Sequence, residues 1–231
     1  ASRRRSGSAA SFATGAMAAT FRKELRLLWR DAALLSQVFL RVLYLLPLAF
    51  IMLRNAGAHM TYALPAGAAA LTFMTGQVSG SLSWVTVSAE DAPELLACSP
   101  TPISTLMRAK LAAALTPVAV LLVFPLIALI VIAPVVALAA LAGCAASAVA
   151  SSLINAWYNK PAKRADFRRR RAGSWLGALF QAVVTALIGM ATAAAALPTP
   201  LALIPAVVAL LALLLMRRSD TQIAQALQAV T

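Results

Sequence analysis

The sequence predicts an all-α polytopic membrane protein with six transmembrane helices and an N-terminal amphipathic helix at the membrane surface. Hydrophobic residues make up 61% of the 231 residues and charged residues only 12%, whereas soluble domains carry about a quarter charged residues. The apolar residues form continuous blocks and do not alternate with polar ones, which favours helices over a membrane β-barrel. This composition excludes an ordinary soluble domain, and it excludes a disordered chain because disorder requires low hydrophobicity.

Residues 1–19 are predicted to form a flexible basic tail or an interdomain linker. They are small, polar and basic, and they lack the apolar core of a signal peptide. Residues 20–231 are predicted to form a single six-helix membrane domain. A fragment of a longer polypeptide stays open as an interpretation of this organisation.

Residues 20–34 are predicted to form the amphipathic helix. Its apolar side chains fall on one helical face, and basic side chains at four-residue spacing fall on another. The apolar set is Phe21, Leu25, Leu28, Trp29 and Ala32, and the basic set is Arg22, Arg26 and Arg30. Such a helix lies in the membrane interface without crossing it. A cytoplasmic extension of the first span, packed on protein, is a compatible alternative.

Six apolar blocks follow, and each is predicted to cross the membrane. A span needs about 20 apolar residues to cover the hydrocarbon layer. The blocks cover about 32–53, 62–87, 111–133, 135–157, 174–197 and 201–216. The sixth block is the shortest, so Arg217 and Arg218 are expected to snorkel towards the headgroups, or the bilayer to thin locally.

The net charge of +13 falls almost entirely on one predicted side of the membrane. All of the 20 basic residues except Arg41 and Arg54 lie in segments that are cytoplasmic if both termini are cytoplasmic, and so do all seven acidic residues. We therefore expect a multi-pass protein of the inner membrane with both termini in the cytoplasm. Basic residues that flank apolar blocks indicate contact with anionic lipid headgroups, and they do not favour nucleic acid binding.

The segment 88–110, between the second and third blocks, is predicted to contain a short acidic helix. Asp91 can cap this helix, because Glu94 follows three residues later and completes a capping box. The functional hypothesis is that the helix docks a cytoplasmic protein, and the alternative is a plain surface loop. The residues assigned to docking are Glu90, Asp91, Glu94, Leu95 and Leu96. The second basic loop, 159–174, is interpreted as a lipid-binding stretch.

One charge and several small residues stand out inside the blocks. Arg41 is the only charge well inside a block, and both a functional role and structural snorkelling stay open for it. Small residues at four-residue spacing predict close helix packing at Gly76, Gly80, Gly143 and Ser147. Few polar side chains are expected to line the spans, which favours an amphipathic or lipid-like cargo.

The motifs that would indicate covalent chemistry are missing from the sequence. It contains no Walker A motif, no catalytic His and Glu pair and no acidic cluster that would hold magnesium. Cys98 and Cys144 are far apart and suggest neither a disulfide nor a metal site. We therefore expect no catalytic residues, no metal and no cofactor bound directly by this chain.

Three strings carry a family resemblance: KELRLLWRDAALLSQVFLRVLYLLPLAF, SAEDAPELLACSPTPISTLMRAKL and NKPAKRADFRRRRAGS. They resemble permease subunits of ABC-2 type exporters, in a bacterial branch where two six-span halves are fused. The resemblance implies that residues about 89–99 form the coupling helix. It also implies a second six-span half, fused or homodimeric, and a cytoplasmic ABC ATPase that binds ATP and magnesium.

Two other functions stay open on the sequence. An integral membrane enzyme acting on lipid or polyprenyl substrates would need a charged cluster at the interface, for which only Glu90, Asp91 and Glu94 are available. A non-transporting membrane scaffold would need none of these residues.

Overall fold

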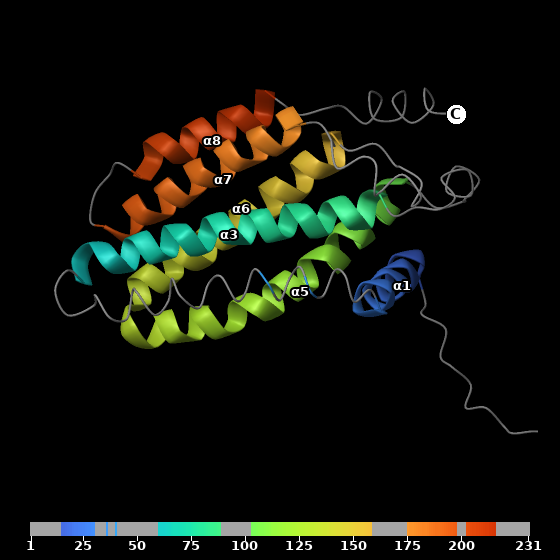
Figure 1. Cartoon of the computed structure of the whole chain (residues 1–231), viewed down its shortest axis with the longest axis horizontal. Helices are drawn as coiled ribbons and strands as arrows, with labels where there is room; N and C mark the ends of the chain where they lie inside the picture. Colours follow the sequence, from blue (N-terminus) through green and yellow to red (C-terminus); the bar gives the residue numbers. More distant parts are fainter. Residues whose placement is uncertain are drawn as a thin grey trace, which may run out of the picture.

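The computed structural model describes residues 15–30, 36, 40, 60–88, 103–158, 175–197 and 202–215. The regular elements in these ranges are all α-helices (Figure 1). They are α1 (Ala16–Arg30), α3 (Met60–Ser88), α5 (Ile103–Ile132), α6 (Pro134–Tyr158), α7 (Trp175–Ala196) and α8 (Leu203–Leu215). The expected all-helical fold class is thus confirmed for this part of the chain.

The five helices from α3 to α8 form a bundle in which successive helices run in opposite directions (Figure 1). One end of the bundle therefore gathers the end of α3, the start of α5, the end of α6, the start of α7 and the end of α8. These are the helix ends that border the segments expected in the cytoplasm. The short helix α1 lies at this same end.

Within the described ranges, three helices, α5, α6 and α7, are long and apolar enough to cross a membrane. Helix α8 is apolar but shorter, which agrees with the brevity of the sixth block. Helix α3 has 29 residues but is not among the three, because Ser, Thr and Gly interrupt its apolar residues. The first block, 32–53, lies outside the described residues apart from helical Ser36 and Leu40.

The observed helix ends follow turn signals in the sequence. A single non-helical residue, Ala133, separates α5 from α6, and Pro134 begins α6, as proline suits the first turn of a helix. Helix α5 begins at Ile103, so residues 103–110 of the predicted loop are helical. Helix α1 begins four residues earlier than the predicted start at residue 20, directly after Gly15, whose φ of 143° suits glycine.

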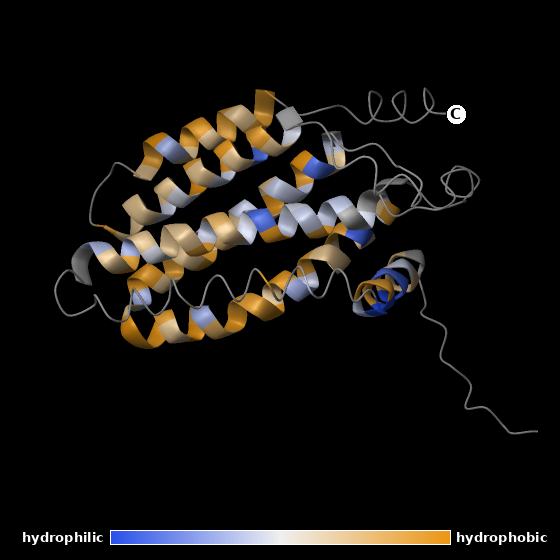
Figure 2. Ribbon diagram, viewed as in Figure 1, coloured by the Kyte–Doolittle hydropathy of each residue, from blue (hydrophilic) through white to orange (hydrophobic). Residues whose placement is uncertain are grey.

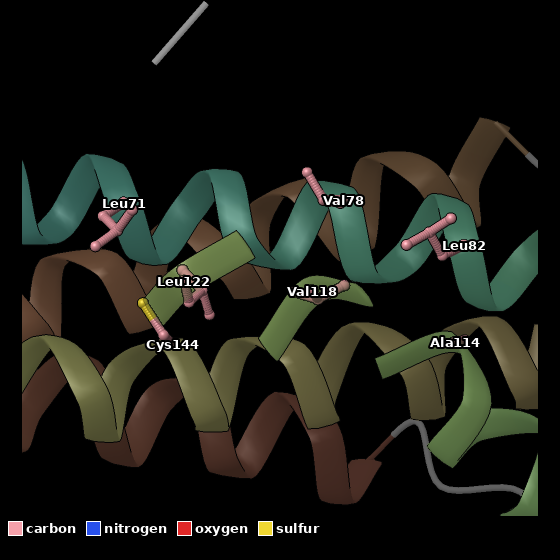
Figure 3. Close-up of a cluster of buried hydrophobic side chains, with 7 residues drawn as sticks. All are labelled: Leu71, Val78, Leu82, Ala114, Val118, Leu122 and Cys144. Atoms are coloured by element: carbon pink, nitrogen blue, oxygen red, sulfur yellow. The ribbon is translucent and has the colours of Figure 1, made fainter. Parts of the chain in front are cut away.

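Apolar side chains hold α3, α5 and α6 together. In one cluster, Leu71, Val78 and Leu82 of α3 meet side chains from α5 and α6 (Figure 3). The partners are Ala114, Val118, Leu122 and Cys144. Proline residues interrupt the hydrogen-bond ladders of these helices: Pro65 lies in α3, and Pro117 and Pro125 lie in α5.

Helices α5 and α8 differ from α3 in hydropathy. Figure 2 shows α5 and α8 as strongly hydrophobic, whereas much of α3 is paler. The outward face of α5 exposes large apolar side chains such as Val123, Phe124 and Val131. Such a face suits lipid or another apolar helix.

Candidate functional site

The most distinctive interior feature is a set of buried polar side chains between α3, α6 and α7, which we call the polar seam. Helix α3 packs extensively on both α6 and α7, and these two also pack on each other. The polar seam comprises Thr72, Thr75, Ser79, Ser83, Ser147, Ser151, Ser152, Asn155, Gln181, Thr185 and Thr192, and all are buried. This corrects the expectation that few polar side chains line the predicted spans.

Two amide side chains join all three helices near the middle of the polar seam. Asn155 Nδ2 on α6 donates to Gln181 Oε1 on α7 at 2.7 Å and to the Ser151 carbonyl at 2.8 Å. Gln181 Nε2 in turn donates to the Gly76 carbonyl of α3 at 3.3 Å. Each amide is thus partnered, which avoids the cost of burying an unpaired polar group.

Glycine makes room for this amide pair. A Cβ added to Gly80 would lie 2.6 Å from both Cδ and Oε1 of Gln181, far closer than atoms normally approach. At Gly76, an added Cβ would meet Thr185 Cγ2 and the Ser147 hydroxyl. The small residues on α3 therefore let polar side chains from the other two helices reach its backbone.

The same pattern recurs at the end of the polar seam farther from α1. Thr72 Oγ1 donates to Thr192 Oγ1 at 3.4 Å, and a Cβ at Gly143 would meet both hydroxyls. Cys144 lies beside Thr72, whose hydroxyl oxygen is 3.8 Å from its sulfur. The Thr75 hydroxyl donates to the same sulfur at 3.5 Å. At the opposite end, Ser83 Oγ donates to Ser152 Oγ at 2.8 Å. Direct hydrogen bonds between hydroxyls thus link the helices at both ends of the polar seam.

A second site joins α1 to the start of α5. Helix α1 buries Glu24 and Leu28, which are 6% and 8% exposed, while Lys110 of α5 is 5% exposed. Burial lowers the pKa of Lys110, the nearby Glu24 carboxylate partly offsets this effect, and neighbouring Lys23 adds to it. Glu24 also pairs with Lys23 at 3.7 Å. A buried pair of opposite charges therefore lies where α1 meets α5.

The remaining predicted residues of α1 divide between its two sides. Phe21 and Leu25 are half-buried, whereas Arg22, Arg26 and Arg30 are exposed. Trp29, which the sequence predicts on the apolar face, is 69% exposed. Viewed down the helix axis, it lies at the boundary between Leu25 and the arginines. A side chain at this boundary suits the lipid headgroup region.

The structure brings together only some of the residues singled out in the sequence. Gly76, Gly80, Gly143 and Ser147 all lie at contacts between helices. The coupling residues Glu90, Asp91, Glu94, Leu95 and Leu96 lie outside the described residues, as do Ala32 and the intramembrane charge Arg41.

Sequence reasoning missed the larger part of the polar seam. A signal was present in α3, where Thr72, Thr75, Ser79, Ser83 and Thr86 recur at spacings of three or four and so share a helical face. Asn155 and Gln181 could have been recognised as amides in apolar surroundings, which in a membrane require partners.

The chemistry available to these sites is neutral hydrogen bonding and one buried charge pair. Within the described ranges, no group of three or more His, Cys, Asp and Glu side chains could hold a metal ion. Comparison of the chain with protein-family models, with curated proteins and with solved structures finds no match.

Proposed function

We propose that this chain is the transmembrane permease subunit, or one half of the permease, of an ATP-driven ABC-2 type exporter. The observation that carries the proposal is the contact of α1 with the start of α5, made through Glu24, Leu28 and Lys110. This contact lies directly after the 89–102 segment, which joins α3 to α5 at the same end of the bundle. An amphipathic helix that packs on the start of α5, the helix that follows this segment in the sequence, suits a device that receives force from a cytoplasmic protein.

The two helices joined by this loop differ in how firmly they are held. Helix α3 is bound into the polar seam, whereas α5 has one largely exposed face and contains Pro117 and Pro125. Proline removes a backbone hydrogen bond and allows bending. In the proposed mechanism, an ATPase pushes on residues 89–99, and α5 and α1 tilt together against the firmer unit of α3, α6 and α7.

The proposed partners follow from this mechanism. A cytoplasmic ABC ATPase would bind ATP and magnesium, and a second six-span half would complete the pathway, as a fused half or another copy. The exposed arginines and Trp29 of α1 suit the lipid headgroups of a bacterial inner membrane with both termini cytoplasmic. A lipid-like cargo was favoured only because few polar side chains were expected in the spans, and the polar seam contradicts that expectation. We therefore propose no substrate class.

The proposal is tested by reversing a charge in the coupling segment. Truncating one member of a buried charged pair at an interface costs about 2–5 kcal/mol, and far less at a rim. Glu94→Lys, alone or with Asp91→Lys, should release the ATPase from the chain or uncouple ATP hydrolysis from transport. Arg169→Ala in the basic loop is the matched control and should retain both. Co-purification of the ATPase from native membranes is compared at equal expression. Retention of the ATPase and of full transport by both acidic variants would reject the proposed docking role.

A further inference from the structure

We infer that the polar seam binds internal water between α3 and α6, at a site formed by Ser79, Ser147 and Ser151. These three hydroxyl oxygens are fully buried and have no hydrogen-bond partner within the described part of the chain. Burying a hydroxyl without a partner costs about 1–3 kcal/mol in proteins. Three such groups on the facing sides of α3 and α6 therefore indicate a shared ligand that satisfies them.

Two of the serines, on α6, reach the same point on α3, and the third lies on α3 itself. A Cβ added to Gly76 would meet the Ser147 hydroxyl and would lie 3.0 Å from the Ser151 hydroxyl. Ser79 lies on the face of α3 that meets α6, because Thr75 and Ser83, four residues before and after it, both bond to side chains of α6. The hydroxyls of α6 thus reach the α3 backbone where Gly76 has no side chain.

Other hydroxyls on the same helices satisfy themselves within their own helix, and these three do not. Thr75 donates to the Leu71 carbonyl at 2.7 Å, Thr185 donates to the Gln181 carbonyl at 2.9 Å, and Thr192 donates to the Ile188 carbonyl at 2.9 Å. Ser79, Ser147 and Ser151 make no such bond. Their hydrogen-bonding capacity is therefore directed between the helices.

Water is the ligand whose chemistry fits. A buried water typically makes about three hydrogen bonds to polar groups that have no other partner, and a hydroxyl can donate to it or accept from it. The described side chains of the polar seam are neutral, so they offer no countercharge to an ion. This inference depends only on the helix packing and does not require the proposed transport function.

Water-edited solid-state NMR of the unsubstituted chain in lipid bilayers tests the inference, and substitutions in the seam serve only to assign signals. With ¹³C-labelled serine and threonine, magnetisation from water should reach the Cβ atoms of Ser79, Ser147 and Ser151 several-fold faster than that of Thr75. Thr75 is the matched control because it is equally buried and bonds within its own helix. Single Ser→Ala variants assign the three signals. Build-up at the serines as slow as at Thr75 would overturn the inference.

Thermal unfolding supplies a second, independent measurement. If the serines share water, Ser79→Ala, Ser147→Ala and Ser151→Ala should each lower the Tm. The paired variants should lower it by less than the sum of the single effects, because groups with a shared partner are coupled. Ser147→Ala combined with Thr116→Ala on α5 is the control and should be additive, because Thr116 bonds to the Ala112 carbonyl of its own helix. A rise in Tm, or additive effects among the serines, would show that removing these hydroxyls costs no bound water and would refute the site.

Discussion

Asn155 on α6 and Gln181 on α7 share a hydrogen bond of 2.7 Å inside the helix bundle. The same Gln181 amide donates to the Gly76 carbonyl of α3, so one pair of side chains joins three helices. Hydrogen bonds of this kind give membrane helices specific partners that apolar packing alone does not define.

Replacing both amides should destabilise the chain by less than the sum of the two single replacements. Asn155→Leu or Gln181→Leu leaves the remaining partner short of a hydrogen bond, and we expect a loss of about 1–3 kcal/mol in unfolding free energy. The double variant should lose less than the sum of the two single variants. Denaturation in detergent, followed by circular dichroism, measures the double-mutant cycle. Strictly additive losses would contradict the proposed energetic link between the two amides.

Gly80→Ala should disrupt the same amide pair from the opposite side. The added methyl would lie against the amide of Gln181 and force it to move, so its bonds to Asn155 and Gly76 should weaken. We expect a lower Tm, and we expect the decrease to be smaller in a chain that already carries Gln181→Ala, where the methyl meets no amide. An equal decrease in both backgrounds would show that the methyl acts on something other than Gln181.

Removing the buried carboxylate of α1 should loosen the attachment of α1 to α5. Glu24→Gln removes the negative charge that partly offsets the burial of the Lys110 ammonium, and it leaves that buried positive charge less compensated. Limited proteolysis should then cut near α1 several-fold faster. Lys23→Gln is the control, because the Lys23 side chain is 61% exposed and its removal should change the cutting rate little. Equal rates for the wild type and Glu24→Gln would exclude a fastening role for this carboxylate.

Cysteine labelling should place the two predicted loop types on opposite sides of the membrane. In a chain with Cys98→Ser and Cys144→Ala, a membrane-impermeant thiol reagent should react with Ala58→Cys in intact cells. The reagent should react with Ala165→Cys only after permeabilisation, because basic segments stay in the cytoplasm. The reverse pattern would overturn the proposed topology.

The helices were predictable where apolar blocks met clear turn signals. The block 135–157 corresponds to α6 and the block 174–197 to α7, within one residue at each helix end. The polar seam was harder to predict because its members are far apart in sequence: Thr72 and Thr192 are bonded across 120 residues. Ser, Thr and Gly have hydropathy values close to zero. Their clustering on one face of α3 therefore changes the mean hydropathy of the whole block only slightly.

The burial of Glu24 was equally hidden in the sequence of α1. Within α1 it is the only acidic residue, and it follows Lys23 in a basic helix, so its surroundings suggest an exposed surface charge. The position of Lys110 on α5 gives this buried carboxylate an opposite charge nearby. Contacts between distant helices of this kind cannot be read from local periodicity.

The low apolarity of α3 has a consequence for the biogenesis of the protein. Its Ser and Thr side chains face α6 and α7, which are synthesised after it. A nascent chain that ended before Pro134 would therefore expose these hydroxyls to whatever surrounds α3, whether lipid, translocon or chaperone. Stable integration of α3 should come late in synthesis, when α7 emerges and completes the three-helix unit.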